Sequence, residues 1–372
     1  MGIYSIILLL SFVFAISNLF IKKSRDRIFL LIIFFLLFAI SAIRVNVGAD
    51  YIHMRDDVFY QIGGSFSGGT YVESGYSFLN ALLYNLFFGK YHSLLILSAL
   101  LYTSVFYFLI KYLVEKRWRP YSAFLYIGTG IFFATLNLTR QYWAISLVII
   151  AFLLFIKYKD EKKPVLSCIL PLALICLAST FHLSSLISLL FIPFFYLAKG
   201  KHGKKVFIAL LILSAIVMVV DIRNIISLVS SILPGRWQWY MGSSQFTGRN
   251  ISAIVKQIPI LIMAIYALVR YNALSKKNKH FHAIATTFFL SAAISNIGFG
   301  VMVLIRLSYY FDFAVLLLLP IILTDIKDWL GNKYYYVGLT CSSAYYIALT
   351  VTTVFVMNGQ GVMPYSSLLG GF

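Results

Sequence analysis

Long apolar segments dominate this chain, and short polar segments separate them. Most of the apolar segments have about the length, ~20 residues, that an α-helix needs to cross a hydrocarbon core of ~30 Å. Since backbone groups in lipid must be satisfied within a segment, each one is expected to be a helix rather than an open strand. The pattern predicts spans at about 2–21, 28–43, 92–114, 121–137, 141–156, 164–180, 183–198, 205–220, 252–270, 281–303, 306–323 and 334–356.

The predicted fold class is therefore all-α, a polytopic integral membrane protein with about 12 transmembrane helices in a single transmembrane domain, 1–372. Two longer polar segments interrupt the spans. The first, 44–91, contains a short apolar block at 76–88, which is predicted to be a re-entrant or interfacial helix. The second, 221–251, is predicted to be a long outer loop whose Trp and Tyr side chains are interface anchors or platforms for sugar rings.

Composition supports the membrane prediction and excludes a soluble globular protein. The chain is 61% hydrophobic and only 12% charged, with a mean hydropathy of +0.88. Its net charge of +19 would suggest nucleic acid binding in a soluble protein. In a membrane protein, Lys and Arg accumulate in cytoplasmic loops, so topology explains the charge and no nucleic-acid partner is expected. Segment 1–21 is expected to be a retained first span.

The basic residues divide between the two sides of the predicted membrane. Most fall in one set of loops, at 22–27, 116–119, 157–163, 199–205, 270–279 and 327–333, which are therefore cytoplasmic. The opposite loops hold Arg44, Arg55, Lys90, Arg140, Arg223, Arg236, Arg249 and Arg306. If 76–88 crossed the membrane, every later loop would change sides and the basic residues would no longer concentrate on one side. All but one of the outer residues are Arg, whose planar fork suits phosphate or carboxylate, which indicates an anionic ligand on the outer face.

The first outer loop concentrates polar residues in a chain with few of them. Arg44 and Asp50 suit a site in which an Arg holds a phosphate and an Asp accepts a proton. The alternative is an Arg at a helix end that reaches the interface, beside a turn-forming Asp. The mixed charges of Arg55, Asp56 and Asp57 are more typical of a solvated face.

Three more positions are candidates for chemistry at membrane depth. Arg140 lies in a very tight turn between apolar blocks and needs an anionic partner, either a ligand or a structural ion pair. His182 lies between two abutting spans, where it either transfers protons or bonds to nearby backbone. Arg306 is predicted to begin a span that also holds Asp312, so it binds a ligand or pairs with an Asp across helices.

The cytoplasmic loops show no Gly-rich nucleotide loop, and the sequence shows no metal-ligand cluster. Cys168, Cys176 and Cys341 lie in apolar blocks without metal spacing or a paired outer-loop partner, so disulfides are not expected. These features favour an enzyme independent of metals, nucleotides and other cofactors.

Several motifs, in order, resemble the EpsG-like branch of the Wzy-type polysaccharide polymerases. Arg44-x-x-x-Gly48-x-Asp50-Tyr51 resembles that family's R…G-x-D-Y loop, and Glu73-Ser74-Gly75-Tyr76 is similar to its E-P-G-Y/F, with Ser in place of Pro. The segment Asn137-Leu138-Thr139-Arg140-Gln141, followed by Ala144, resembles N-x-x-R-Q-x-x-A. Phe181-His182 resembles its F-H-x-S element, and Arg306-x-x-Tyr309-Tyr310-Phe311 its late R-x-x-Y-F element.

The resemblance implies a polymerase of undecaprenyl-pyrophosphate-linked oligosaccharide repeat units at the outer face of the bacterial cytoplasmic membrane. Its partners would be this lipid-linked donor and acceptor, the membrane lipid, a flippase and a chain-length regulator. The resemblance, together with the chemistry above, implies two groups of site residues. One group binds the pyrophosphate and is called the pyrophosphate grip, and the other supplies a base. The grip comprises Arg44, Arg140 and Arg306; Asp50 is the first candidate for the base and His182 the second; Tyr51, Glu73, Gln141 and Tyr310 would bind substrate.

Three other classes compete with the polymerase. A transporter or flippase of lipid-linked glycan would show inverted repeats and broken spans in matching halves, and no clear internal repeat is present. An O-antigen ligase is chemically close and differs in its acceptor, which would be lipid A core or cell wall instead of a sugar repeat. A membrane acyltransferase with cytoplasmic donors would need an inward-facing site, which the sequence does not show.

Overall fold

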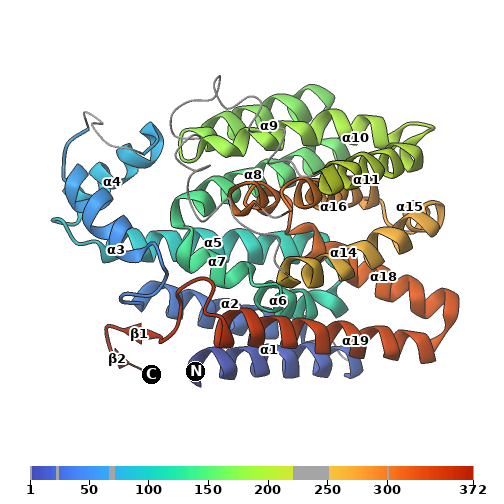
Figure 1. Cartoon of the computed structure of the whole chain (residues 1–372), viewed down its shortest axis with the longest axis horizontal. Coiled ribbons are helices and arrows are strands. Elements are labelled where there is room, and N and C mark those ends of the chain that lie inside the picture. The colour runs from blue at the N-terminus through green and yellow to red at the C-terminus, as the bar shows by residue number, and fades with distance from the viewer. Residues whose placement is uncertain (1, 22–24, 67–71, 221–250, 300, 372) are drawn as a thin grey trace. The chain divides into compact units, whose positions relative to one another are not determined.

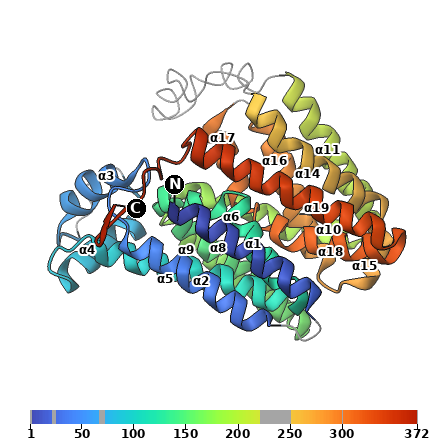
Figure 2. The ribbon, with the colours of Figure 1, turned by 90° about the horizontal axis from the view of Figure 1, so that it is seen from below.

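The computed structural model describes residues 2–21, 25–66, 72–220, 251–299 and 301–371. It contains two compact units, the first formed by Met1–Leu186 with Ile326–Phe372 and the second by Ile187–Asp325 (Figures 1 and 2). Each unit is described by itself. The predicted outer loop 221–251 lies outside the described residues except for Ile251, which begins a helix. A single transmembrane domain stays a prediction.

The first unit is helical apart from one short hairpin. Its helices are α1 (Gly2–Phe20), α2 (Asp26–Ile43), α3 (Tyr51–His53), α4 (Ser74–Leu86), α5 (His92–Leu113), α6 (Arg119–Gly128), α7 (Ile131–Asn137), α8 (Thr139–Asp160), α9 (Pro164–Ser179) and α19 (Asn332–Thr350). A π-helix, Met54–Tyr60, continues α3, and another, Val351–Val356, continues α19. The strands β1 (Ser366–Ser367) and β2 (Gly370–Gly371) pair antiparallel near the C-terminus.

The second unit is also helical. A 3-10 helix, Leu183–Leu190, leads from the first unit into it. Its other helices are α10 (Phe191–Lys199), α11 (Gly203–Val220), α14 (Ile251–Val269), α15 (Tyr271–Lys277), α16 (Phe281–Ile297), α17 (Met302–Ile305), the 3-10 turn Ser308–Tyr310 and most of α18 (Ala314–Leu330). The predicted all-α class is therefore confirmed.

Each unit is built around one helix that is buried on all sides. In α6, every residue from Pro120 to Gly128 is buried, and α1, α2 and α19 pack against this helix. In the second unit, α16 is buried almost throughout, and α10, α11 and α14 pack against it. A helix that is apolar on every face can be stable only inside a core, so these two segments organise their units.

Helices at the periphery expose large apolar side chains that a water-soluble protein would bury. Examples are Leu9 of α1 at 64% exposure, Phe35 of α2 at 64%, Ile169 of α9 at 56% and Ile262 of α14 at 62%. Contiguous exposed apolar surface of this extent requires a nonpolar environment. Together with the apolar helices, this surface identifies the chain as a membrane protein.

Five described helices are long and apolar enough to cross a membrane, or six if one bent pair counts as a single span. The five are α1, α2, α5, α8 and α19 with its π-helical extension, and the bent pair is Gln257–Val269 with Tyr271–Lys277, at 80°. Shorter apolar helices occur at Pro164–Ser179, Leu183–Lys199 and Phe281–Ile297. The predicted count of about 12 spans is not confirmed.

Two predicted spans differ from the structure for local reasons. The span expected at 121–137 breaks into α6 and α7, because the chain turns at Thr129 and Gly130, where Gly130 has φ +84°. The span expected at 306–323 begins only at α18, because residues 306–313 form turns and a 3-10 turn. The short helix expected at 76–88 is present as α4.

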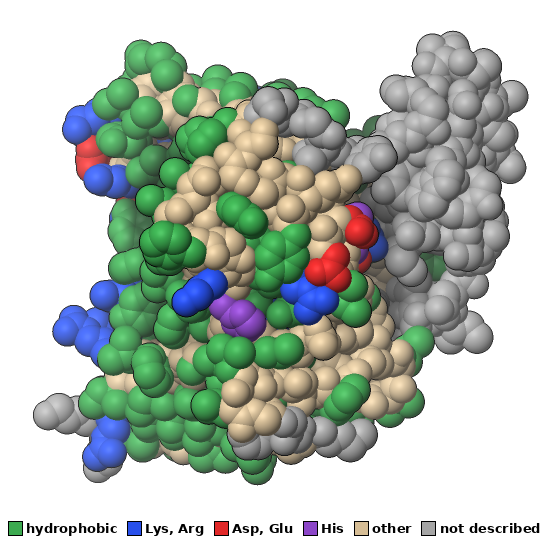
Figure 3. All heavy atoms as spheres, turned by 90° about the vertical axis from the view of Figure 1, so that its left-hand side faces the viewer, with side chains coloured by type: hydrophobic (Ala, Val, Ile, Leu, Met, Phe, Trp, Pro, Cys, Tyr) green, Lys and Arg blue, Asp and Glu red, His purple; other side chains and the backbone are tan. Residues whose placement is uncertain are grey.

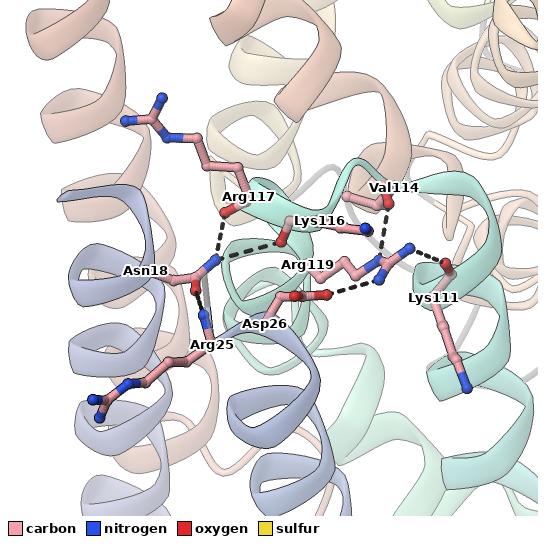
Figure 4. A network of polar contacts seen from close by, with 8 residues as sticks. All are labelled: Asn18, Arg25, Asp26, Lys111, Val114, Lys116, Arg117 and Arg119. Atoms are coloured by element: carbon pink, nitrogen blue, oxygen red, sulfur yellow. Dashed lines mark hydrogen bonds and ion pairs between the residues drawn. The ribbon is translucent and has the colours of Figure 1, made fainter. Parts of the chain in front are cut away.

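A polar network ties together four helix ends at the end of α2 that is far from Arg44 (Figure 4). Arg119 donates to Asp26 Oδ2 at 2.7 Å, and also to the carbonyls of Val114 and Lys111. Asn18 donates to the Arg117 carbonyl at 3.0 Å and accepts from the Arg25 N–H at 2.9 Å. Arg25, Arg117 and Arg119 thus lie at one end of α2, and Arg44 follows its other end.

We expect Arg119→Leu to destabilise the first unit, because the buried Asp26 carboxylate loses its ion-pair partner and two carbonyls lose a donor. Breaking a buried ion pair costs about 3–5 kcal/mol. Thermal unfolding of the purified protein in detergent measures the effect. Lys163→Leu is the matched control, since the Lys163–Glu161 pair is exposed and its loss should leave the midpoint unchanged. Equal midpoints for both variants would contradict the structural role of Arg119.

Candidate functional site

Arg44 follows the last residue of α2 and is buried, with an exposure of 1%. Its Nη1 donates to the Ser41 carbonyl at 2.7 Å, whereas its Nε has no hydrogen-bond partner. The described residues place no carboxylate within ion-pair distance of this guanidinium. A buried, always-charged group without an acidic partner is costly, so its position indicates a site built for negative charge.

Tyrosine side chains surround Arg44. The guanidinium interacts electrostatically with Tyr4, Tyr51, Tyr76, Tyr91, Tyr102 and Tyr365. Burial raises the pKa of Tyr76 to about 12, although the positive charges of Arg140 and Arg44 act in the opposite direction. Burial likewise raises the pKa of Tyr365 to about 12. Both hydroxyls therefore stay protonated at neutral pH and can donate hydrogen bonds.

Several buried polar atoms near Arg44 lack partners among the residues that the structure describes. They include the hydroxyl of Tyr4 and Nε2 of His92, whereas the buried Tyr76 hydroxyl interacts with the Asn80 side chain. Buried polar atoms are normally satisfied, so their concentration at this end of the first unit marks a place for water or a polar ligand. His92 and Asn80 were not among the residues singled out from the sequence.

The loop after Arg44 carries the proposed base and depends on a close backbone approach. Gly48 has φ +106°, and a Cβ there would clash with the Leu136 carbonyl oxygen and lie 3.2 Å from the Asn137 Cα. Asp50 precedes α3, and its N–H donates to Asn137 Oδ1 at 2.9 Å. The Asp50 carboxylate makes no bond or ion pair with another described residue. Gly48 thus lets the loop settle on the end of α7, where it presents Asp50.

Tyr51 packs at the start of α3 and is buried. Its ring contacts the Tyr91 ring edge-on, with centroids 5.4 Å apart. Burial raises its pKa, and the nearby Asn46 backbone and Arg44 oppose that shift. The buried ring positions the loop, so the structure leaves only a limited surface of Tyr51 for the sugar contact expected of it.

Glu73 and Arg140 form an ion pair, although they lie far apart in the sequence. Arg140 Nη1 is 3.0 Å from Glu73 Oε2, without hydrogen-bond geometry, and both side chains are about one-fifth exposed. Glu73 Oε1 accepts the Leu183 N–H at 3.3 Å, next to His182. The anionic partner that the sequence required for Arg140 is therefore a protein carboxylate, while the guanidinium stays partly accessible.

The start of α4 is fixed against the end of α9. Thr180 O accepts the Gly75 N–H at 2.8 Å, and a Cβ on Gly75 would clash with the Thr180 side chain. This contact accounts for Gly75 in the Glu73-Ser74-Gly75-Tyr76 motif. It also holds Glu73 close to the segment that carries His182.

His182 and Gln141 flank the ion pair. His182 is half-buried, and its Nδ1 is 2.6 Å from Ser184 Oγ. Gln141 is buried in the first turn of α8. Two contacts anchor this region: the Tyr102 hydroxyl donates to the Thr139 carbonyl at 2.7 Å, and Trp143 stacks on Phe181 at 5.6 Å. The first unit therefore brings Arg140, Glu73 and His182 to neighbouring positions.

The remaining charges of the first loop pair with one another at the surface. His53 Nδ1 lies 2.8 Å from Asp57 Oδ2, and Arg55 Nε donates to Asp56 Oδ1 at 2.7 Å. The face on which α3 and α4 lie carries few charged side chains, with acidic and basic groups side by side (Figure 3). The interpretation of these residues as a solvated face agrees with this arrangement.

Arg306 and Tyr310 belong to the second unit, whereas the other predicted site residues belong to the first. Arg306 lies in a turn after α17 and is half-buried, and Tyr310 is buried in the following 3-10 turn. Arg306 and Asp312 both lie close enough to Tyr309 to act electrostatically on its hydroxyl. Asp312 Oδ1 accepts a hydrogen bond from Ser291 Oγ at 2.5 Å. Arg306 and Asp312 both precede α18, which begins at Ala314, so the helix predicted to start at Arg306 and to contain Asp312 starts later.

Two further polar residues near Asp50 were not predicted as functional candidates. Asn137 was noticed only as part of a motif, and Gln360 was not noticed at all. Asn137 Nδ2 donates to Gln360 Oε1 at 2.9 Å, which joins the end of α7 to the C-terminal segment. No sequence signal pointed to Gln360, because its partner lies 223 positions away.

The described residues contain no group of three or more His, Cys, Asp or Glu that could hold a metal ion. Cys168, Cys176 and Cys341 are free thiols. The charged groups gathered at the first unit's site are an Arg without an acidic partner, an Arg–Glu pair and an Asp. This set suits binding of an anion and removal of a proton.

Residues 27–367 match the family model described as the EpsG family. The match covers most of the chain, so the protein belongs to the EpsG family, as its motifs suggested. Membership indicates a polysaccharide polymerase-type function in a membrane. No curated protein and no solved structure matches the chain.

We expect Gly48→Ala to abolish most activity and to destabilise the first unit. An Ala at positive φ costs about 1–2 kcal/mol, and here the Leu136 backbone must also move. Gly130→Ala is the matched control, because Gly130 has φ +84° but nothing lies within 4 Å of its would-be Cβ. Midpoints of thermal unfolding and polysaccharide chain length measure both variants. If Gly130→Ala proved as harmful as Gly48→Ala, the close approach would not explain Gly48.

Proposed function

We propose that this protein joins undecaprenyl-pyrophosphate-linked oligosaccharide repeat units into a surface polysaccharide at the outer face of the bacterial cytoplasmic membrane. The observation that carries the proposal is Arg44, a buried guanidinium without a carboxylate partner among the described residues. Together with membership in the EpsG family, it supports a donor that delivers a pyrophosphate to this end of the first unit.

Arg44 and Arg140 differ in burial, so we assign them different roles in binding the pyrophosphate. Arg44 is too deeply buried to meet a large ligand directly, so it contributes positive potential, which is strong at low dielectric. Arg140 is partly exposed and meets Glu73 through Nη1 alone, so the rest of its guanidinium can bind a phosphate. Both charges act on the buried hydroxyl of Tyr76, which links the two positions. The family motif alone assigns Arg306 to the grip.

The proposed reaction is a glycosyl transfer in one step. An acceptor sugar hydroxyl attacks the anomeric carbon of the donor, and a new carbon–oxygen bond forms. The bond between the anomeric carbon and the phosphate oxygen breaks, and undecaprenyl pyrophosphate leaves with the electron pair. Asp50 takes the hydroxyl proton, with His182 as the second candidate. Glu73, Tyr51 and Gln141 would position the sugars, and the family motif alone assigns the same role to Tyr310.

Such a donor carries its own leaving group, so the proposed reaction consumes no nucleotide, metal or other cofactor. Stabilisation of the departing pyrophosphate by fixed positive charges supplies the main electrostatic contribution. The substrates must reach the outer face, so a flippase is a proposed partner. A chain-length regulator is proposed as the second partner, and the membrane lipid surrounds the unit.

Deletion of the gene in its own host, followed by complementation, tests the proposed function. We expect the long-chain polysaccharide ladder to collapse to single repeat units, wild type to restore it and Arg140→Ala to fail. Arg27→Ala, an exposed Arg at the opposite end of α2, is the control and should restore the ladder. Accumulation of lipid-linked units on the inner face would indicate a flippase. Long chains that stay on undecaprenyl pyrophosphate and are missing from lipid A core or cell wall would indicate a ligase.

We expect Asp50→Asn to lower the initial rate of chain extension about 10²–10⁴-fold, since the amide cannot accept the proton. The rate is measured with purified protein and lipid-linked units extracted from the deletion strain. Asp57→Asn is the control, because the Asp57 carboxylate is exposed and pairs with His53. A wild-type rate for Asp50→Asn, with loss of activity in His182→Gln, would assign the base to His182.

A further inference from the structure

Three segments that are remote in sequence meet beside Asp50. They are the loop Gly48–Asp50, the end of α7 at Leu136 and Asn137, and the C-terminal segment at Gln360 and Gly361. Gly48 N–H donates to the Gly361 carbonyl at 2.9 Å, and Ala49 N–H donates to the Gln360 carbonyl at 3.0 Å. The C-terminal segment therefore forms part of the floor on which the loop rests.

Asn137 connects all three segments through its side-chain amide. Its Oδ1 accepts the Asp50 N–H at 2.9 Å, and its Nδ2 donates to Gln360 Oε1 at 2.9 Å. The Asp50 N–H can only donate, so the Asn137 oxygen must face it and the amide nitrogen must face Gln360. Asn137 is 7% exposed, so a lost partner would leave a poorly hydrated polar group.

The C-terminal segment is held in place by contacts of its own. Val45 N–H donates to the Ser366 carbonyl at 2.9 Å, Leu368 N–H donates to the Ile43 carbonyl at 3.0 Å, and Tyr365 donates to the Ile40 carbonyl at 3.0 Å. Asn358 closes the turn by bonding the Met363 N–H and carbonyl. These hydrogen bonds fix the segment that carries Gln360. A residue that positions another must itself be held in place.

We propose that Asn137 and Gln360 are positioning residues for Asp50, so that the C-terminal segment completes the catalytic site. This inference rests on the proposed function, in which Asp50 is the base. The Asp50 carboxylate has no partner of its own among the described residues, and its backbone is what the structure fixes. A shift of the order of 1 Å at such a position can reduce a rate by up to ~10²-fold.

The test compares Gln360→Leu with Gln360→Glu in purified full-length protein. Leu has a similar size and no acceptor, whereas Glu keeps an oxygen that can accept from Asn137. The assay measures kcat and KM for chain extension of lipid-linked repeat units extracted from the deletion strain, per folded enzyme. Gln61→Leu is the matched control, because Gln61 is exposed and is not part of the hydrogen bonds that join Gln360, Asn137 and Asp50.

We expect Gln360→Leu to lower kcat about 10- to 100-fold with KM unchanged, and Gln360→Glu to retain most of the wild-type kcat. In an Asp50→Asn background, Gln360→Leu should reduce the residual rate no further, because it acts through Asp50. Equal losses for the Leu and Glu variants, a wild-type kcat for Gln360→Leu, or an additive loss in the Asp50→Asn background would each overturn the proposal. A wild-type protein unable to extend chains would instead refute the proposed function.

Discussion

The charge of Arg44 is the constraint on which the first unit's site depends. A guanidinium stays protonated at any ordinary pH, and this one is buried at the end of α2 with no acidic partner in the part of the chain that the structure describes. Its Nη1 donates to the Ser41 carbonyl, its Nε has no hydrogen-bond partner, and its backbone pairs with Ser367 of the C-terminal hairpin. The result is a place where negative charge is favoured before any ligand binds.

The second constraint is how close backbones approach around this charge. Gly48 rests on the end of α7, and Gly75 rests on Thr180, so no side chain separates these segments. The two contacts hold Asp50 and the Glu73–Arg140 pair in place without rigid bonds to the Asp50 carboxylate. A proton acceptor fixed through its backbone keeps its own oxygens available for a substrate. The glycines of the motifs thus allow close backbone contacts, and the proposed function assigns the chemistry to the charged residues.

Much of the site was visible in the sequence, and the parts that were not have a common cause. Arg140 and His182 could be found because polar residues between abutting apolar segments are costly and stand out. Arg44 and Asp50 could be found because the first outer loop concentrates polar residues in a chain with few of them. The Glu73–Arg140 partnership could not be found, since an Arg in a tight turn requires an anion without saying which. Gln360 was invisible because an amide in a polar C-terminal segment carries no such signal.

The helices show the same division. The sequence by itself determined that the chain is helical, apolar and membrane-embedded, because lipid requires every backbone group to bond within its own segment. It also determined the motifs that place the chain in the EpsG family. Only the tertiary structure decided that α6 and α7 are separate, that Arg306 lies in a turn and that Gln360 reaches Asn137. Local patterns report the energy of one segment in lipid, whereas these features depend on contacts between segments remote in sequence.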